Sequence, residues 1–179
     1  MISPDSNRIE VRLRELPQLF NSMDPSPFVD RDLDEAAEEF IVTWARELPH
    51  QSELELVIHL ATAPVPERAV GVEEAVHHYF ASRAEIKRRE LRQLLRRGRL
   101  SLLIGLLFMG ICVALGELAL RTLPGGWNNF AEVSLSIVGW VALWRPLEIY
   151  LYDWWPIRGD QRLLERLSRM RVQLIVPTG

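Results

Sequence analysis

The stretch from Leu100 to Leu120 constrains the fold of this chain more than any other part of its sequence. It contains 21 residues and a single charged side chain, Glu117, close to its far end. At about 1.5 Å per residue, a helix of this length reaches roughly 31 Å, which is enough to cross the core of a bilayer. A helix in the core of a soluble domain is rarely apolar on every side for so long. The stretch is therefore predicted to span a membrane. A secretory signal peptide is not expected here, because the stretch is internal and too long.

A second span is predicted over residues 130–151. Its uninterrupted apolar part ends at Trp144 and is too short to cross alone, so the span has to continue past Arg145. The Arg145 side chain is expected to reach the headgroups and to pair with Glu148, three residues further along the same helical face. Pro146 removes one backbone donor and predicts a kink.

Residues 121–129, RTLPGGWNN, connect the two predicted spans through proline and glycine, which are typical of turns. So short a connection predicts an antiparallel helical hairpin. Basic residues lie before the first span and after the second, whereas the connection holds only Arg121. The positive-inside rule then predicts that both termini are cytoplasmic.

Charge is distributed unevenly along the chain. Residues 1–82 carry sixteen Asp and Glu against six Lys and Arg, whereas residues 83–99 carry eight Lys and Arg against two Glu. Basic residues beside a span set its orientation, and they are also expected to contact anionic lipid headgroups, at about 1 kcal/mol each. Nucleic acid is not expected as a partner, because no aromatic residues are interleaved among them. The basic residues are Lys87, Arg88, Arg89, Arg92, Arg96, Arg97 and Arg99.

Residues 150–156, YLYDWWP, place Trp154 and Trp155 at the cytoplasmic end of the second span. Tryptophan and tyrosine are enriched at membrane interfaces, so these rings are expected to anchor the helix at a fixed depth. The alternative is a docking surface for a lipid or a partner helix.

The N-terminal part predicts a small mixed domain. Residues 9–16 and 53–60 alternate apolar and polar side chains as half-buried strands do, and residues 33–48 have helical spacing. A strand, a helix and a strand in this order predict a parallel βαβ unit. A capping box of Asp32 and Glu35 is expected at the helix start. The cross-strand ion pairs are expected to join Arg12 and Arg14 to Glu53 and Glu55.

The C-terminal residues are expected to complete the same domain. Residues 171–176 alternate as a third strand, and residues 160–170 are expected to form an amphipathic helix at the membrane surface. Residues 71–97 predict a helix that continues into the first span, with Gly98 as the one candidate hinge.

These elements define an α+β membrane protein, with a two-helix transmembrane hairpin and a small cytoplasmic head. The head contains a βαβ unit and is completed by a C-terminal strand. The predicted parts are a head (1–70), a basic juxtamembrane helix (71–99), a hairpin (100–151) and an interfacial segment with the final strand (152–179). The 48% hydrophobic content excludes disorder as the main state, and the single Cys112 excludes an internal disulfide and a cysteine-based zinc site.

The loop of residues 21–34 holds the one candidate cation site. Asp24, Asp30, Asp32 and Asp34 alternate partly as oxygen ligands do, but the glycine and distal glutamate of an EF-hand are missing. The preferred interpretation is helix capping. No glycine-rich phosphate loop, GxSxG or HExxH motif is present, so no catalytic residue, metal or cofactor is predicted.

Polar residues within the spans suggest a role. Arg145, Glu148 and Glu117, together with Glu132, need polar partners that two helices alone hardly supply. We expect a non-enzymatic accessory or scaffold subunit that forms a homo-oligomer or joins a larger membrane complex. One alternative is an oligomeric channel or transporter-like pore, with Ser101, Ser134 and Ser136 among its lining residues. Another is a membrane-anchored ligand or cation sensor that acts through the head.

Three blocks carry a resemblance to a known group of proteins. FNSMDPSPF (20–28), AEEFIVTWA (37–45) and WRPLEIYLYDWWP (144–156) resemble those of uncharacterised two-span bacterial inner-membrane proteins. The resemblance implies a multi-pass protein of the bacterial inner (plasma) membrane. It implies no activity and no catalytic residue.

Overall fold

A computed structural model describes residues 7–49, 53–122 and 125–176 of the chain. The chain divides into two compact units. The first, called the head below, comprises Met1–Lys87 and Gly159–Gly179; the second, called the helical unit, comprises Arg88–Arg158. The helical unit is therefore an insertion in the sequence of the head.

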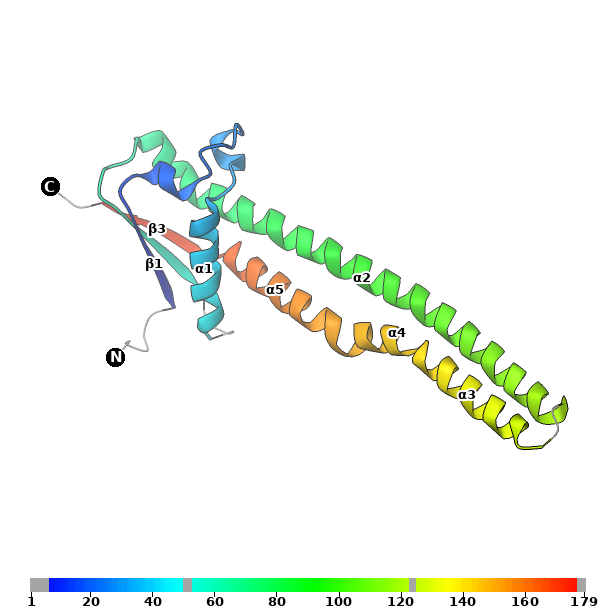
Figure 1. The fold of residues 1–179 in the computed structure, drawn as a ribbon. Helices are drawn as coiled ribbons and strands as arrows, with labels where there is room; N and C mark the ends of the chain where they lie inside the picture. Colours follow the sequence, from blue (N-terminus) through cyan, green and yellow to red (C-terminus); the bar gives the residue numbers. More distant parts are fainter. Residues whose placement is uncertain (1–6, 50–52, 123–124, 177–179) are drawn as a thin grey trace. The chain divides into compact units, whose positions relative to one another are not determined.

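The head is built on a parallel three-stranded sheet with the order β1-β2-β3 (Figure 1). Strand β1 (Arg8–Leu13) leads through helix α1 (Glu35–Glu47) to strand β2 (Glu55–Leu60). Strand β3 (Arg171–Ile175) pairs with the other edge of β2, also in parallel. The predicted βαβ unit and the predicted C-terminal strand are both confirmed.

The register of β1 and β2 corrects the predicted ion pairs. Arg8 lies opposite Glu55, and its Nε is 2.6 Å from Glu55 Oε2. Arg12 lies opposite His59, four positions beyond Glu55. The pairing predicted for Arg12 and Arg14 with the acidic start of β2 is wrong, because parallel strands place the start of one beside the start of the other.

One face of the sheet carries the apolar core. Leu56 in β2 has Ile9 of β1 and Val172 of β3 as its neighbours, and all three pack into the core. Residues one position further along each strand point to the opposite face, as Glu10 and Gln173 do. The alternation seen in the sequence therefore marks the face that the helices cover.

Helix α2 (Pro66–Thr122) extends over 57 residues without a break. Val72, Val76 and Phe80 near its start belong to the head core, each with an exposed fraction of 1% or less. The predicted continuation of the head helix into the apolar stretch is confirmed. No hinge is present at Gly98, because a single glycine weakens a helix without interrupting its hydrogen bonds.

Helix α5 (Trp154–Leu167) begins at Trp154 rather than at residue 160. Leu163, Leu164 and Leu167 are buried in the head core together with Met170. The expectation that this amphipathic helix lies on the membrane surface is wrong, since its apolar side is covered by the head itself.

Helix α1 begins after Asp34, whose Oδ1 accepts hydrogen bonds from Ala36 N at 3.1 Å and from Ala37 N at 3.4 Å. The predicted capping box of Asp32 with Glu35 is therefore wrong by two residues. Asp32 still belongs to the preceding loop, where its carbonyl oxygen accepts a hydrogen bond from Asn21 N at 2.8 Å. The 3₁₀ turns of this loop are η1 (Leu16–Leu19) and η2 (Phe28–Asp30).

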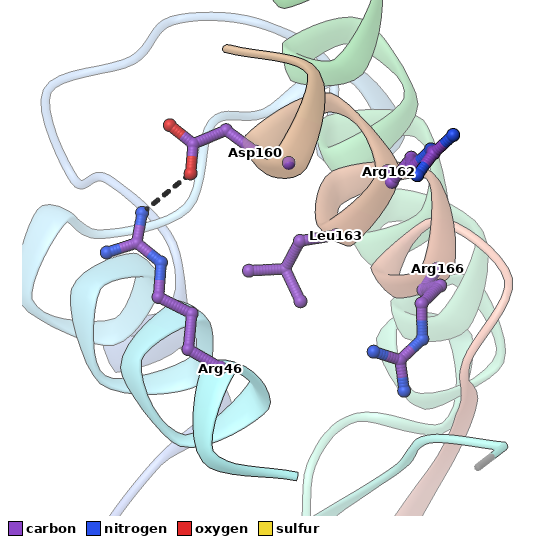
Figure 2. A pocket seen from close by; sticks show the side chains of 6 residues that line it. Arg46, Asp160, Arg162, Leu163 and Arg166 are labelled. Atoms are coloured by element: carbon purple, nitrogen blue, oxygen red, sulfur yellow. Dashed lines mark hydrogen bonds and ion pairs between the residues drawn. The ribbon is translucent and has the colours of Figure 1, made fainter. Parts of the chain in front are cut away.

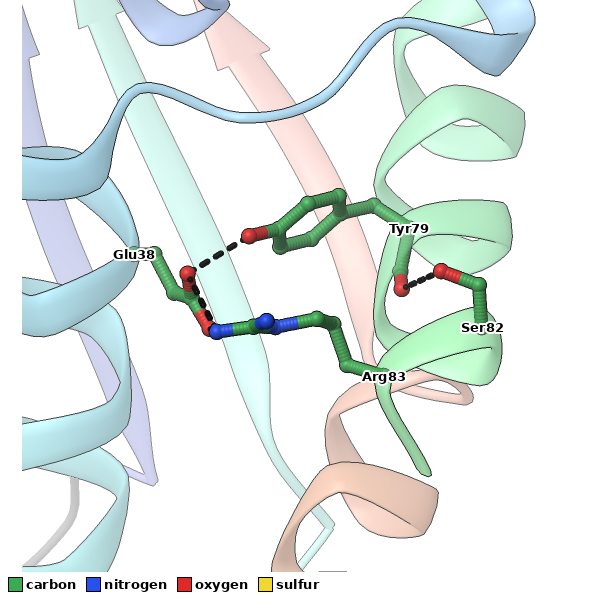
Figure 3. A network of polar contacts seen from close by, with 4 residues as sticks. All are labelled: Glu38, Tyr79, Ser82 and Arg83. Carbon is green, nitrogen blue, oxygen red and sulfur yellow. Dashed lines mark hydrogen bonds and ion pairs between the residues drawn. The ribbon is translucent and has the colours of Figure 1, made fainter. Parts of the chain in front are cut away.

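A polar network around Glu38 joins α1 to α2 in the head (Figure 3). The Tyr79 hydroxyl donates to Glu38 Oε2 at 2.5 Å, and Arg83 Nε donates to Glu38 Oε1 at 3.0 Å. Burial of the Tyr79 ring, together with the bond to Glu38, raises the pKa of Tyr79. The hydroxyl therefore remains a donor at neutral pH, and the carboxylate holds both partners on α2.

The helical unit continues after α2 with a turn at Gly125, where φ is +72°, a conformation that favours glycine. Between this turn and α5, the chain forms three helical segments rather than one helix. They are α3 (Trp127–Val141), α4 (Trp144–Glu148) and the π-helical turn η3 (Ile149–Asp153).

Candidate membrane-embedded site

Among the described residues, one helix is long and apolar enough to cross a membrane, the Ala69–Thr122 part of α2. Only 17% of its most apolar window is buried, and the exposed fractions of Leu103 and Leu107 are 66% and 68%. The core helix of a soluble protein would be mostly buried. An exposed apolar surface of this kind indicates contact with lipid or with another protein.

Small residues allow α2 to approach α3 and the residues just after it closely. A Cβ atom at Gly105 would lie 3.0 Å from Leu143 Cδ2, and one at Gly139 would lie 3.3 Å from Cys112 Cβ. As the residue number rises along α2, its partner's number falls along the returning chain, so the two segments are antiparallel. This contact of Gly105, Met109 and Cys112 in α2 with Gly139 and Leu143 in the returning chain is called the seam below. Cys112, the single cysteine, is buried in the seam as a small side chain.

The returning chain is interrupted at Ala142 and Leu143, so the prediction of one helix over residues 130–151 is wrong in its continuity. Pro146 has no N–H to donate to the Ala142 carbonyl one turn earlier. Just before it, Leu143 N donates to Trp140 O at 3.0 Å, three residues back rather than the four of an α-helix. The disturbance predicted at the proline is thus present, one turn before it.

Charged side chains gather where α4 meets the π-helical turn. Arg145 Nη1 lies 3.0 Å from Glu148 Oε2 and 3.6 Å from Asp153 Oδ2, and Trp144 Nε1 donates to Glu148 Oε1 at 2.9 Å. The predicted pair of Arg145 and Glu148 is confirmed. The contribution of Asp153 was missed, because eight residues separate it from Arg145 and the π-helical turn changes the helical spacing.

The other polar residues of the predicted spans are spread out. Glu117 Oε2 lies 3.8 Å from Arg121 Nη2, and both side chains are exposed. Ser101 Oγ donates to the backbone carbonyl three residues earlier. Ser134 and Ser136 are two positions apart in α3 and so point to different sides of the helix. No shared polar face is formed by these two serines, and the pore alternative stays a prediction.

The basic residues predicted to contact headgroups lie along α2. Arg89, Arg92 and Arg96 line an open groove of about 300 Å³ together with Gln93. Spacings of three and four residues place these arginines on neighbouring parts of one helical face. Arg88, Arg97 and Arg99 are exposed and Lys87 is half-buried on the same helix.

The two predicted interfacial tryptophans occupy the start of α5. Trp154 Nε1 donates to Tyr150 O at 2.8 Å, and the guanidinium of Arg158 lies 5.6 Å from the centre of the Trp154 ring. Trp155 is 66% exposed. One indole is therefore held by the protein, while the other is open to its surroundings.

The acidic loop is held together by its own backbone. Asp24 Oδ1 accepts from Ser26 N at 2.9 Å and Asp24 Oδ2 from Asp32 N at 2.8 Å. These bonds, that from the Asp32 amide foremost, lower the pKa of Asp24. Asp30 Oδ1 lies 3.5 Å from His78 Nδ1. Within the described residues, no three His, Cys, Asp or Glu side chains lie together as a metal site requires.

Fold and site together define a class: a mixed chain with a parallel three-stranded sheet and one long apolar helix. Comparison with protein-family models, with curated proteins and with solved structures found no match. The resemblance to two-span bacterial inner-membrane proteins therefore stays a prediction.

Sequence reasoning missed the network of Glu38, Tyr79 and Arg83. Glu38 is 41 residues from Tyr79 and 45 from Arg83, so no local spacing brings them together. One signal was present: Glu38 lies on the polar side of an amphipathic helix, four positions after the capping Asp34.

Proposed function

We propose that this protein crosses the membrane twice and keeps both termini in the cytoplasm. The observation that supports this most strongly is the pairing of β3 with β2. Strand β2 precedes the apolar helix and β3 follows it, yet both belong to one sheet. A chain that crosses the membrane in α2 has to return before it reaches β3. The apolar segment from residue 127 to residue 151 is the part of the chain suited to that return.

The broken returning segment is compatible with a membrane. Irregular backbone is tolerated at membrane depth where other parts of the protein cover it. The Ala142 carbonyl oxygen lies 3.1 Å from the position that a Cβ atom at Gly105 would occupy, so α2 packs directly against the break. Arg145 has two carboxylates as partners, as a charged group near hydrocarbon requires.

Orientation follows from the basic residues. They are concentrated on α2 before the apolar stretch and on α5 after it, while the connection holds Arg121 alone. This distribution supports a cytoplasmic head, with the basic residues of α2 at anionic headgroups. The sequence resemblance suggests that the membrane is a bacterial inner membrane.

We further propose that the protein is a non-enzymatic scaffold that associates with copies of itself. Leu103, Leu107, Gly110 and Ala114 share the face of α2 opposite the seam, and all four are exposed. A Cβ atom at Gly110 would meet nothing within 4 Å, so a second helix has room to approach closely there. Glu117, which lies 3.8 Å from Arg121, is exposed near the same face, and a second polar partner from a neighbouring copy would stabilise it further in lipid.

Self-association is tested by disulfide crosslinking in native membranes. The only lysine is Lys87, so amine-reactive reagents have few targets, and cysteines are introduced instead into a Cys112→Ala background. Leu107→Cys and Gly110→Cys are expected to give covalent dimers on mild oxidation. Met109→Cys is the matched control, because this position packs against Gly139 in the seam. Monomer at all three positions would contradict the scaffold proposal.

A further inference from the structure

A cavity in the head lies between the last turn of α1 and the first part of α5 that belongs to the head. Its volume is about 450 Å³, within the range of small-molecule sites. Figure 2 shows Leu163 between the side chains of Arg46 and Arg166. The lining residues are Arg46, Gly159, Asp160, Arg162, Leu163 and Arg166.

Two contacts shape this cavity. Arg46 Nη2 lies 3.0 Å from Asp160 Oδ1, and this ion pair between two lining residues joins α1 to α5 (Figure 2). Arg166 Nη2 donates to Pro49 O at 2.9 Å, just beyond the end of α1. Both guanidinium groups therefore have a hydrogen-bond partner within the head.

The charge of the cavity is strongly positive. Three arginines face one carboxylate, so the lining carries a net charge of +2. A guanidinium has five N–H donors in a planar fork, and the bond with Asp160 uses one of those of Arg46. Leu163, only 8% exposed, supplies an apolar wall. Such a fork matches the oxygens of a phosphate group in a bidentate arrangement.

We propose that this cavity binds a phosphate monoester, with the guanidinium groups of its three lining arginines as the contacts. The same chemistry is offered by a soluble phosphate monoester and by the headgroup of phosphatidic acid. This site goes beyond the scaffold proposal and does not depend on it, because all six lining residues belong to the head.

The groove on α2 provides the contrast. Its arginines come from one helix, and it has no apolar wall, since Gln93 is its remaining lining residue. The head cavity combines residues of two helices and is larger. A discrete ligand is therefore expected in the head cavity, whereas the groove suits non-specific attraction to headgroups.

The test uses the full-length chain in phosphatidylcholine nanodiscs at about 150 mM salt, where exposed charges are screened. In one arm, glycerol 3-phosphate is titrated calorimetrically. In the other, nanodiscs contain phosphatidic acid and phosphatidylcholine, and lipid retained by the protein is identified by native mass spectrometry. The variants are Arg46→Gln/Arg162→Gln, the matched head control Arg12→Gln/Arg14→Gln and the groove variant Arg89→Gln/Arg92→Gln/Arg96→Gln. Circular dichroism verifies folding of each.

Saturable binding in either arm is expected, weakened at least tenfold by Arg46→Gln/Arg162→Gln and within twofold of wild type in the head control. The groove variant is compared in the glycerol 3-phosphate arm alone, where it is also expected to bind within twofold of wild type. The arm that gives this result identifies the source of the phosphate group. Absence of binding in both arms would overturn the proposal, as would a loss as large in the head control or the groove variant. The oligomeric state is read from the same spectra, so a monomer that binds would reject the scaffold and leave the phosphate site standing.

Discussion

Glu38 carries the polar contacts that hold α1 against α2 in the head. Its carboxylate accepts from the Tyr79 hydroxyl and from Arg83. Glu38→Ala is expected to lower the free energy of unfolding by about 1.5–3 kcal/mol, because it removes hydrogen bonds to a charged group and leaves the hydroxyl of the buried Tyr79 without its acceptor. The measurement is denaturant unfolding of the full chain in detergent, followed by circular dichroism.

Tyr79→Phe removes only one of these bonds and is expected to have a smaller effect, about 1 kcal/mol. Tyr152→Phe is the matched control, since that ring is 71% exposed. If Glu38→Ala were as stable as the Tyr152→Phe protein, the network would contribute nothing to the head.

Asp24 gives the head a defined response to acid. Backbone amides hold the pKa of its carboxyl below the ordinary value, so the ionised form is favoured in the folded state. The resulting stability is complete above about pH 4 and is lost as the pH falls through the lowered pKa of the folded protein. In Asp24→Asn, the loss of stability on acidification below about pH 4 is expected to be shallower than in wild type.

The measurement is the unfolding midpoint of both proteins at a series of pH values from neutral to about 3. Glu39→Gln, which removes an exposed carboxyl of α1, is expected to follow the wild-type profile. Parallel profiles for wild type and Asp24→Asn would show that the loop carboxylate makes no such contribution.

At the scale of elements, the sequence predicted best where a pattern is local. The alternation in β1, β2 and β3 reflects which side chains the core buries. In α1 the helical spacing marks the buried Ile41 and Ala45, but Phe40 and Trp44 are 41% and 40% exposed. The long apolar stretch of α2 was predicted equally well from the sequence. Lipid and a protein surface both favour apolar side chains, so the stretch can be recognised without knowing which of them covers it.

Features that depend on register or on distant partners were not predictable. The pairing of Arg8 with Glu55 needs the parallel register, which the pattern of one strand does not contain. The apolar side of α5 looks the same whether it faces lipid or a protein core, and only the fold shows that Leu167 is buried in the head. The head cavity likewise joins Arg46 to residues more than a hundred positions away.

The packing of α2 against α3 makes a prediction about the lone cysteine. A Cβ atom at position 139 would lie 3.3 Å from Cys112 Cβ, close to the separation of about 3.5–4.5 Å in disulfides. Gly139→Cys is therefore expected to form an intramolecular disulfide with Cys112 on oxidation in membranes. Loss of both free thiols in a band that still migrates as a monomer is the readout.

Gly110→Cys with the native Cys112 is the control for that experiment. Its position lies two residues away on the same helix and points to another side, so no intramolecular disulfide is expected. Retention of both thiols by Gly139→Cys would contradict the seam as described.

At the scale of the whole molecule, the order of the strands restricts how the chain can cross a membrane. The helical unit, Arg88–Arg158, is inserted between two strands that hydrogen-bond to each other. Folding of the head therefore requires both ends of the insertion on the same side of any membrane that it crosses. An even number of crossings follows from this, independently of the distribution of arginines.

The most direct test labels single cysteines with a membrane-impermeant maleimide in intact bacterial cells that express the full chain with Cys112→Ala. Gly126→Cys, in the connection between the predicted spans, is expected to react in intact cells. Glu39→Cys, exposed on α1 in the head, is expected to react only after the inner membrane is permeabilised. Labelling of Glu39→Cys in intact cells, or protection of Gly126→Cys until permeabilisation, would contradict two crossings with a cytoplasmic head.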